Sequence, residues 1–287
     1  MLAVVACGKS SSPPPAPAPA PPAQGSATWT CEPLAFDAST PLPEASGATW
    51  LDGKIVAVGD SGQHGAYAII DPATGKTIEQ GTLPLGEPAT ASDDLEGLAT
   101  LDGQLVGIAS AGWIRVWART AKGFDLVQGP YALGPVDLPN SKGIGDKPPK
   151  GDGMVCPLEG TNCGRNYEGI CLGATGGYVL SKADGHLYRV TIENKQLVVH
   201  REGAIEVGRP GVVADCSIDE TGGVWVGNNL FGMNDVRRVS PSGPDLGTLG
   251  AGFAEVLVVH EGTVFRMSDT GGAPSLMGKF RCAANAR

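Results

Sequence analysis

The sequence contains no apolar run of about 20 residues, the length that an α-helix needs to cross a bilayer. It also lacks a sustained i, i+3, i+4, i+7 apolar pattern, so we expect little helix. Basic residues are few: 21 Lys and Arg stand against 30 Asp and Glu, a net charge of −9. Because nucleic-acid binding needs clustered basic residues, we expect no nucleic-acid partner, and cations and basic or neutral ligands instead.

Glycine and proline, by contrast, are abundant, with 43 and 23 residues in a chain of 287. This composition excludes a helical bundle or a long coiled coil. From Trp29 onward, short apolar runs such as Lys54–Val58 and Gln104–Ile108 are bounded by Gly, Asp or Asn. Such runs are strand and turn signals, so the sequence predicts an all-β chain.

The strands recur in five similar units, which start near residues 46, 96, 168, 214 and 255. For example, Ser46–Val56 aligns with Glu96–Val106, and each unit reads as an opening strand followed by three more. Units of this length with four strands are typical of a β-propeller, because stacked sheets bury one another's faces. We therefore predict that residues 29–287 form a β-propeller with five blades of four antiparallel strands, six being the alternative. Residues 133–165 are interpreted as a loop insertion.

The first residues resemble a bacterial lipobox, because Val4-Val5-Ala6 runs directly into Cys7. The resemblance implies that residues 1–7 end a lipoprotein signal, that Cys7 is lipidated, and that the domain is held at the membrane of the cell envelope, in the periplasm or outside the cell. Six residues are too few for a full signal, so we expect translation to start upstream of Met1. Residues 8–28, rich in Pro and Ala, predict an extended linker. A chance cysteine is the alternative.

Six further cysteines make an even number, which is typical of disulfides in an exported protein. Their spacing favours three pairs: Cys31 with Cys282, Cys156 with Cys163, and, by what remains, Cys171 with Cys216. The first pair would join a strand near Trp29–Leu34 to the last blade and close the ring. A zinc site is the alternative, but the sequence has no CxxC pair.

Three glutamates occupy equivalent places in the opening strands of their units: Glu96, Glu168 and Glu255. Opening strands line the channel of a propeller, so these side chains should meet at one end of it, with Asp215 next to them. Carboxylates this close need a cation or a proton, and Ca²⁺ takes six to eight oxygens in irregular geometry. We therefore predict these four residues as metal ligands and Ca²⁺ as the cofactor. Alternatively, each carboxylate accepts backbone hydrogen bonds and only staples neighbouring blades.

The motif Gly59-Asp60-Ser61-Gly62 follows a predicted strand and has the form of a nucleophile loop. A nucleophilic serine needs a base within hydrogen-bond reach, and the sequence offers no Asp-x-x-His motif. We interpret this motif as a turn.

The repeats Asp94-Leu-Glu-Gly-Leu-Ala, Asn166-Tyr-Glu-Gly-Ile and Val58-Gly-Asp-Ser-Gly resemble those of the esterase-like phytase and SdiA-regulated propeller families. The resemblance covers about residues 44–270 and implies an exported, calcium-associated propeller, in some members with phosphoesterase activity. The sequence departs from a phytase because its basic residues are isolated, such as Lys182 and Arg189, and a polyphosphate needs several together.

Two functional hypotheses follow. The first is an envelope-anchored propeller that binds a cation and an unidentified small-molecule or protein ligand. The alternative is a calcium-dependent phosphoesterase, in which the same carboxylates hold a metal ion that activates water.

Overall fold

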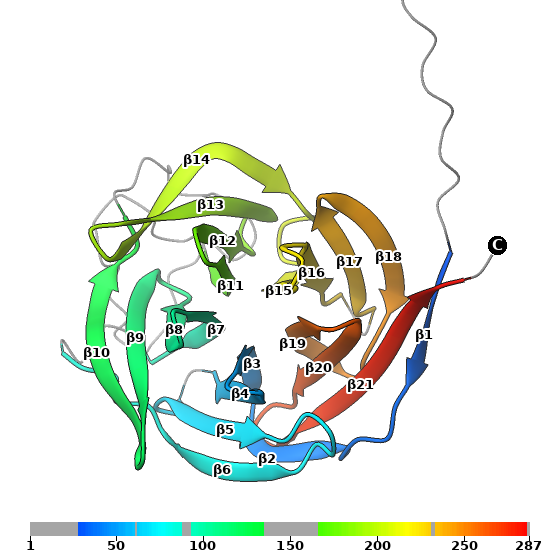
Figure 1. The fold of residues 1–287 in the computed structure, drawn as a ribbon, viewed down its shortest axis with the longest axis horizontal. Coiled ribbons are helices and arrows are strands. Elements are labelled where there is room, and N and C mark those ends of the chain that lie inside the picture. Colours follow the sequence, from blue (N-terminus) through cyan, green and yellow to red (C-terminus); the bar gives the residue numbers. More distant parts are fainter. Residues whose placement is uncertain (1–27, 61, 88–92, 135–165, 231–232, 286–287) are drawn as a thin grey trace, which may run out of the picture.

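The computed structural model describes residues 28–60, 62–87, 93–134, 166–230 and 233–285. Every regular element in these ranges is a β-strand, and the strands form five sheets around a central axis (Figure 1). None of the residues described here form a helix long and apolar enough to cross a membrane. The chain is a five-bladed β-propeller, which confirms the predicted fold.

Blades 1 to 4 each consist of four antiparallel strands that follow one another in the chain from the axis outwards. Blade 1 comprises β3 (Ala45–Leu51), β4 (Lys54–Gly59), β5 (Ala66–Ile70) and β6 (Thr77–Thr82). Blade 2 comprises β7 (Leu95–Leu101), β8 (Gln104–Ala109), β9 (Trp113–Thr120) and β10 (Gly123–Ala132). Blade 3 comprises β11 (Tyr167–Gly173), β12 (Gly176–Ser181), β13 (His186–Glu193) and β14 (Gln196–Glu206). Blade 4 comprises β15 (Val213–Ile218), β16 (Val224–Asn228), β17 (Asp235–Ser240) and β18 (Ser242–Thr248).

Blade 5 joins the two ends of the chain. Its inner strands are β19 (Phe253–His260), β20 (Thr263–Asp269) and β21 (Pro274–Ala284), and its outer strand is β1 (Trp29–Pro33). A further strand, β2 (Ser39–Pro43), also pairs with β21. Cys31 lies directly opposite Cys282 in the β1–β21 ladder, and the two form a disulfide. This confirms the predicted ring closure, which leaves the first and last blades without open edges at the seam.

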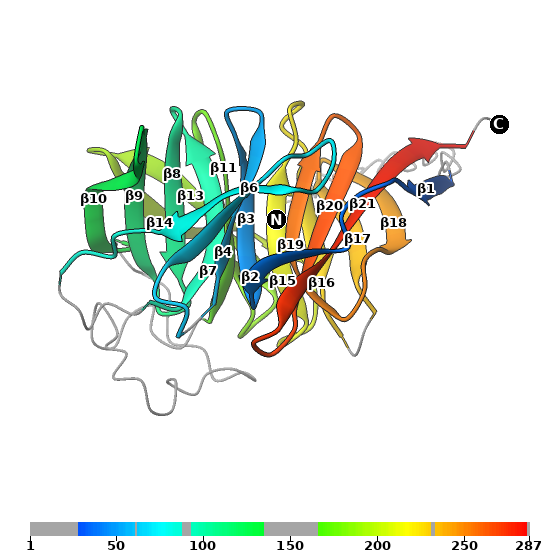
Figure 2. The ribbon, with the colours of Figure 1, turned by 90° about the horizontal axis from the view of Figure 1, so that it is seen from below.

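The hydrophobic core is divided among the five interfaces between blades. Strand β4 shows why: Ile55 and Ala57 face blade 5, whereas Val56 and Val58 face blade 2. Alternate side chains of a strand point to opposite faces, so a nearly continuous apolar run is buried on both sides. Seen from the side, the strands run between the two ends of the ring (Figure 2).

Glycines allow the opening strands to approach one another closely near the axis. A Cβ atom on Gly47 would lie 2.7 Å from the Cα of Gly97, and one on Gly97 would lie 2.7 Å from the Cα of Gly169. Any side chain at these places would force neighbouring blades apart. Each of these glycines directly follows the position that carries Ser46, Glu96 or Glu168, so the Glu-Gly pairs of the repeats combine a channel side chain with a close contact.

Candidate metal centre

A β-bulge at the start of every opening strand places one residue outside the regular pairing. In the order of the blades, these residues are Ser46, Glu96, Glu168, Ala214 and Glu255. The bulge thus occurs at the same place in all five blades, and it falls on the positions that the repeat alignment made equivalent. Bulges re-aim side chains, and here they bring three glutamates close enough for the charge of Glu96 to interact with those of Glu168 and Glu255.

A second set of equivalent positions lies at the end of the second strand of each blade or directly after it. These residues are Asp60, Ser110, Lys182, Asn229 and Asp269. In the first four blades, the backbone amide of this residue donates a hydrogen bond to the residue two before the bulge; for example, Asp60 donates to Glu44 and Ser110 donates to Asp94. The same end of the channel therefore receives side chains from both the first and the second strand of each blade.

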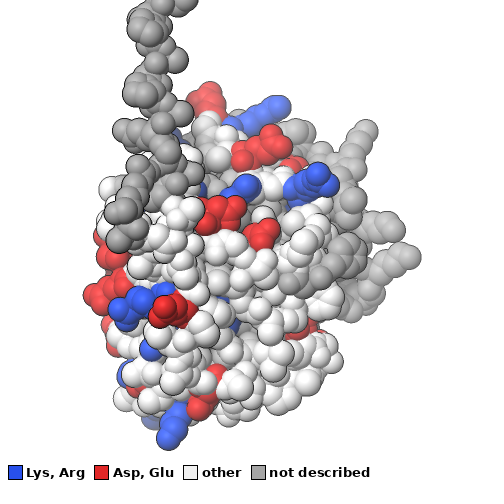
Figure 3. All heavy atoms as spheres, turned by 90° about the vertical axis from the view of Figure 1, so that its right-hand side faces the viewer, with Lys and Arg blue, Asp and Glu red and all other residues white. Residues whose placement is uncertain are grey.

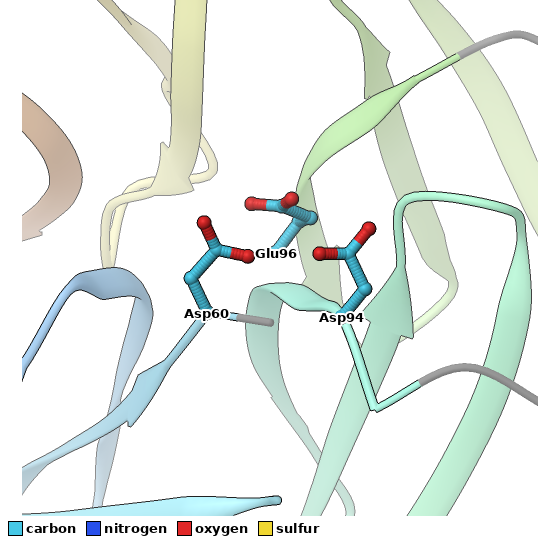
Figure 4. A group of neighbouring side chains, drawn as sticks. All are labelled: Asp60, Asp94 and Glu96. Carbon is cyan, nitrogen blue, oxygen red and sulfur yellow. The ribbon is translucent and has the colours of Figure 1, made fainter. Parts of the chain in front are cut away.

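Three carboxylates gather on the side of blades 1 and 2: Asp60, Asp94 and Glu96 (Figure 4). One oxygen of each lies within 4.8 Å of the others. Glu96 is only 8% exposed, and no hydrogen bond reaches its carboxylate among the described residues. Burial, followed by repulsion from Glu168, Asp60 and Asp94, raises the pKa of Glu96 well above its usual range. We call these three residues the acidic trio.

On the other side of the channel end, a lysine lies close to two of the glutamates. Lys182 Nζ lies 2.9 Å from Glu168 Oε2 and 3.7 Å from Glu255 Oε1. Asn166 donates to the second oxygen of Glu168 at 2.8 Å. Burial raises the pKa of Glu168 to about 8, although Lys182 opposes the shift. Burial alone would lower the pKa of Lys182, but its two glutamate neighbours more than offset this and raise it.

Asp215 has a different role. Its Oδ1 accepts a hydrogen bond from the amide of Cys216 at 2.7 Å, and its Oδ2 accepts one from the amide of Leu257, on the next blade, at 2.8 Å. Asp215 follows the bulge residue Ala214 and occupies the place of the axial glycines of blades 1 to 3. Its carboxylate therefore joins two blades, as the stapling alternative describes.

The four predicted metal ligands thus fall into three environments: Glu96 in the acidic trio, Glu168 and Glu255 around Lys182, and Asp215 between blades. Sequence reasoning did not identify Asp60 or Asp94 as ligands. Both stood in the motifs that were singled out, Asp94 two residues before Glu96, and Asp60 in the turn after a strand. Their place in these motifs, close to Glu96 in one and at the end of a strand in the other, was the available signal.

The predicted disulfide between Cys171 and Cys216 is present and joins β11 to β15 beside the channel. Cys7, Ser61 and the predicted pair of Cys156 and Cys163 lie outside the described residues, as does most of the loop insertion. On the face shown in Figure 3, acidic and basic side chains are interspersed, without a basic patch.

No protein-family model and no curated protein sequence matches this chain. Among solved structures, it is similar to the glutaminyl cyclase of Myxococcus xanthus, with 13% identity over 90% of this chain and 99% of that one and a TM-score of 0.55. It is also similar to a provisionally named gluconolactonase, with 15% identity over 92% of this chain and 94% of the other and a TM-score of 0.51. At these identities the likeness shows the β-propeller fold alone.

Proposed function

We propose that this protein is a cation-binding propeller of the cell envelope, which holds one Ca²⁺ ion at the acidic trio and presents it to a ligand at the channel end. Glu96 carries the proposal. It is a buried carboxylate without a hydrogen-bond donor among the described residues, and two further carboxylates face it within 4.8 Å. Buried charges are ordinarily paired or bound to metal, so this arrangement favours an ion.

The donors favour a hard cation. All three side chains of the trio offer carboxylate oxygens, and neither Cys nor His belongs to the group. Oxygen-only sites suit Ca²⁺, Mg²⁺ or Mn²⁺ rather than Zn²⁺. Three carboxylates do not satisfy the six to eight oxygens that Ca²⁺ takes, so a bound ion would keep positions for water or for oxygens of a ligand.

The charge of the site favours binding over phosphate chemistry. Five carboxylates interact at this channel end, and Lys182 is the one lysine among them in the residues described. Carboxylates outnumber ammonium groups among the described residues here, and a phosphate dianion binds best where several basic groups meet. The structural neighbours are named for enzymes of other kinds, and propellers host unrelated functions, so the fold does not decide between binding and catalysis.

A calcium titration tests the proposal. The full-length protein is stripped with EDTA, and its thermal unfolding is followed as CaCl₂ is added. At 100 times the dissociation constant, binding to the folded state alone should add about 2.7 kcal/mol of stability. Asp94→Asn should remove most of this gain, whereas Asp102→Asn, an exposed carboxylate in the β7–β8 turn, should keep it. Stability unchanged by Ca²⁺, Mg²⁺ and Mn²⁺ would overturn the proposal.

A phosphomonoester assay on the same samples tests the alternative function. Turnover that requires Ca²⁺ and is lost in Asp94→Asn would favour the phosphoesterase. We expect calcium-dependent stabilisation without such turnover.

We also propose that acylation of Cys7 holds the propeller at a bacterial membrane. The support is the lipobox-like sequence and the Pro/Ala-rich residues that follow it. Expression with the native upstream sequence should place the protein in the membrane fraction, and Cys7→Ser should release it. Equal membrane association of both proteins would contradict the anchor.

A further inference from the structure

A cavity of about 310 Å³ lies between blades 2 and 3, which are neighbours in the ring (Figure 1). Small-molecule sites in proteins have volumes of roughly 300 to 1,000 Å³. Residues of the β7–β8 turn line the cavity, whereas Glu96 stands at the start of β7, so the cavity and the acidic trio lie at opposite ends of this strand. Its apolar wall consists of Leu101, Val106, Val116, Tyr131, Ile192 and Leu197. All six belong to the core cluster of this interface or pack against it, so the wall is part of the folded core.

A smaller cavity, of about 210 Å³, occupies the equivalent place between blades 1 and 2. Its wall on blade 1 includes Leu51 and Val56. These residues align with Leu101 and Val106, which stand 50 positions later in the wall of the larger cavity. The two cavities are therefore the same kind of cleft between consecutive blades, and their contents can be compared residue by residue.

An ion pair crosses the smaller cavity. Arg119 of blade 2 donates to both carboxylate oxygens of Glu79 of blade 1, at 2.7 and 2.5 Å. The guanidinium group of Arg119 also lies 5.0 Å from the centroid of the Phe124 ring. All three residues line this cavity, so two charged groups and a ring occupy the space between the sheets.

The larger cavity has smaller or uncharged side chains at the same three positions. The register of the outer strands gives the equivalent residues, which are Glu79 and Gln128, Arg119 and Ile192, and Phe124 and Leu197. An amide thus replaces the carboxylate, an isoleucine replaces the guanidinium, and a leucine replaces the phenyl ring. These exchanges remove the ion pair and leave a wider cleft with an apolar wall.

Two hydrogen bonds connect the walls of the larger cavity. The side-chain amide of Gln128 donates to the carbonyl of Lys195 at 2.9 Å, and the backbone amide of Leu197 donates to the hydroxyl of Tyr131 at 3.1 Å. The Tyr131 oxygen is the acceptor in this bond, and its proton has no acceptor among the residues described here. A phenol can donate as well as accept, so Tyr131 can still donate to a molecule in the cavity.

We propose that the cavity between blades 2 and 3 binds a flat, uncharged molecule of about two fused rings that carries a hydrogen-bond acceptor. The size follows from volume, because an apolar cavity of ~150 Å³ accepts benzene and this one is about twice as large. The shape follows from position, because a gap between two packed sheets favours a flat ring system. The acceptor would take the proton of Tyr131.

The lining also argues against a charged ligand. Among the lining residues, Asp102 and Lys195 are the charged ones; they have opposite signs and both are exposed. A charged ligand would lose its hydration on entering the apolar part and would gain no buried counter-ion there. The inference goes beyond the proposed cation binding and does not depend on it.

Titration of the full-length protein into prodan, an uncharged naphthalene that carries a ketone, tests the inference. The emission of prodan shifts to shorter wavelength in apolar surroundings, so the shift measures binding. In EDTA, the wild-type protein should bind with a dissociation constant on the order of 100 µM. Gln128→Glu/Ile192→Arg copies the ion pair of the neighbouring cleft and should weaken binding by about 10-fold or more. Leu197→Phe, which copies the Phe124 ring, gives the same measurement if the double variant does not fold.

The matched control is Val127→Ser, which removes an apolar side chain that is 51% exposed on the same strand, β10, and should leave the affinity unchanged. The absence of an emission shift with the wild-type protein would refute the inference. Equal affinity in the wild type and in the folded variant that fills the cleft would also refute it, as would loss of binding in Val127→Ser, since prodan would then bind the exposed surface. EDTA is present throughout, so a failure of the proposed calcium binding does not change the result.

Discussion

Replacement of Glu96 by glutamine should make the protein more stable than the wild type without metal, and less stable than the wild type in saturating Ca²⁺. In the absence of metal, the buried Glu96 carboxylate faces two others within 4.8 Å. At an effective dielectric constant of about 20, each such pair repels by about 3 kcal/mol. Glutamine has nearly the same shape and no charge, so Glu96→Gln removes the repulsion and leaves the packing in place.

The free-energy cost of protonating Glu96 sets an upper limit on the stability that Glu96→Gln can add to the metal-free protein. At pH 7, holding a proton on a carboxyl whose ordinary pKa is 4.5 costs about 3 kcal/mol, which is the most that Glu96 can lose by staying neutral. We therefore expect Glu96→Gln to stabilise the metal-free protein by about 2 to 3 kcal/mol. In saturating Ca²⁺ the wild type should regain its advantage, because the variant lacks a ligand.

Urea unfolding at pH 7, in EDTA and in millimolar CaCl₂, measures both values. Asp215→Asn is the matched control: its carboxylate accepts two backbone hydrogen bonds, so the variant should be less stable than the wild type under both conditions. A Glu96→Gln variant that is destabilised in EDTA would show that Glu96 supports the fold in the manner of Asp215, and would refute the reasoning.

Two further predictions concern the same molecule. Without metal, stability should fall as the pH rises from about 5 to 8: the folded pKa of Glu168 is about 8 against an ordinary 4.5, so the folded state binds the extra proton and high pH favours unfolding. Urea unfolding in EDTA at three pH values checks this, and stability that rises across the range contradicts it. The double variant Cys31→Ser/Cys282→Ser should lose about 5 kcal/mol, since the bridge spans 251 residues, and Cys171→Ser/Cys216→Ser about 4 kcal/mol, for a span of 45. A smaller loss in the first variant than in the second would mean that strand pairing alone closes the ring.

The repeats carried enough information to predict the architecture. Units that open with Ser46, Glu96 or Glu255 aligned largely through the turn after the opening strand. This turn needs two residues with positive φ, which are Asp52-Gly53, Asp102-Gly103 and Glu261-Gly262. The closure of the ring by a disulfide in blade 5 was predicted from the position of Cys31 and Cys282 at the two ends of the domain. These features depend on local pattern and chain order, which a single sequence contains.

The grouping of the carboxylates was not predictable in the same way. The repeat alignment shows which positions of different blades are equivalent, but it does not show which side chains are in contact. The association of Asp60 with Glu96 and of Lys182 with Glu168 therefore required coordinates. Asp215 stands one residue after the bulge position. A shift of one residue along a strand turns the side chain to the other face, and this places its carboxylate between blades.

The covalent seam in blade 5 also has a mechanical consequence. A load applied to the chain ahead of Trp29 reaches β1, the outermost strand of its sheet, whose hydrogen bonds alone would open one after another. Because Cys31 is linked to Cys282, the load passes after two residues into β21, a strand held by neighbours on both sides. The propeller can therefore be pulled by its N-terminal end without being peeled open.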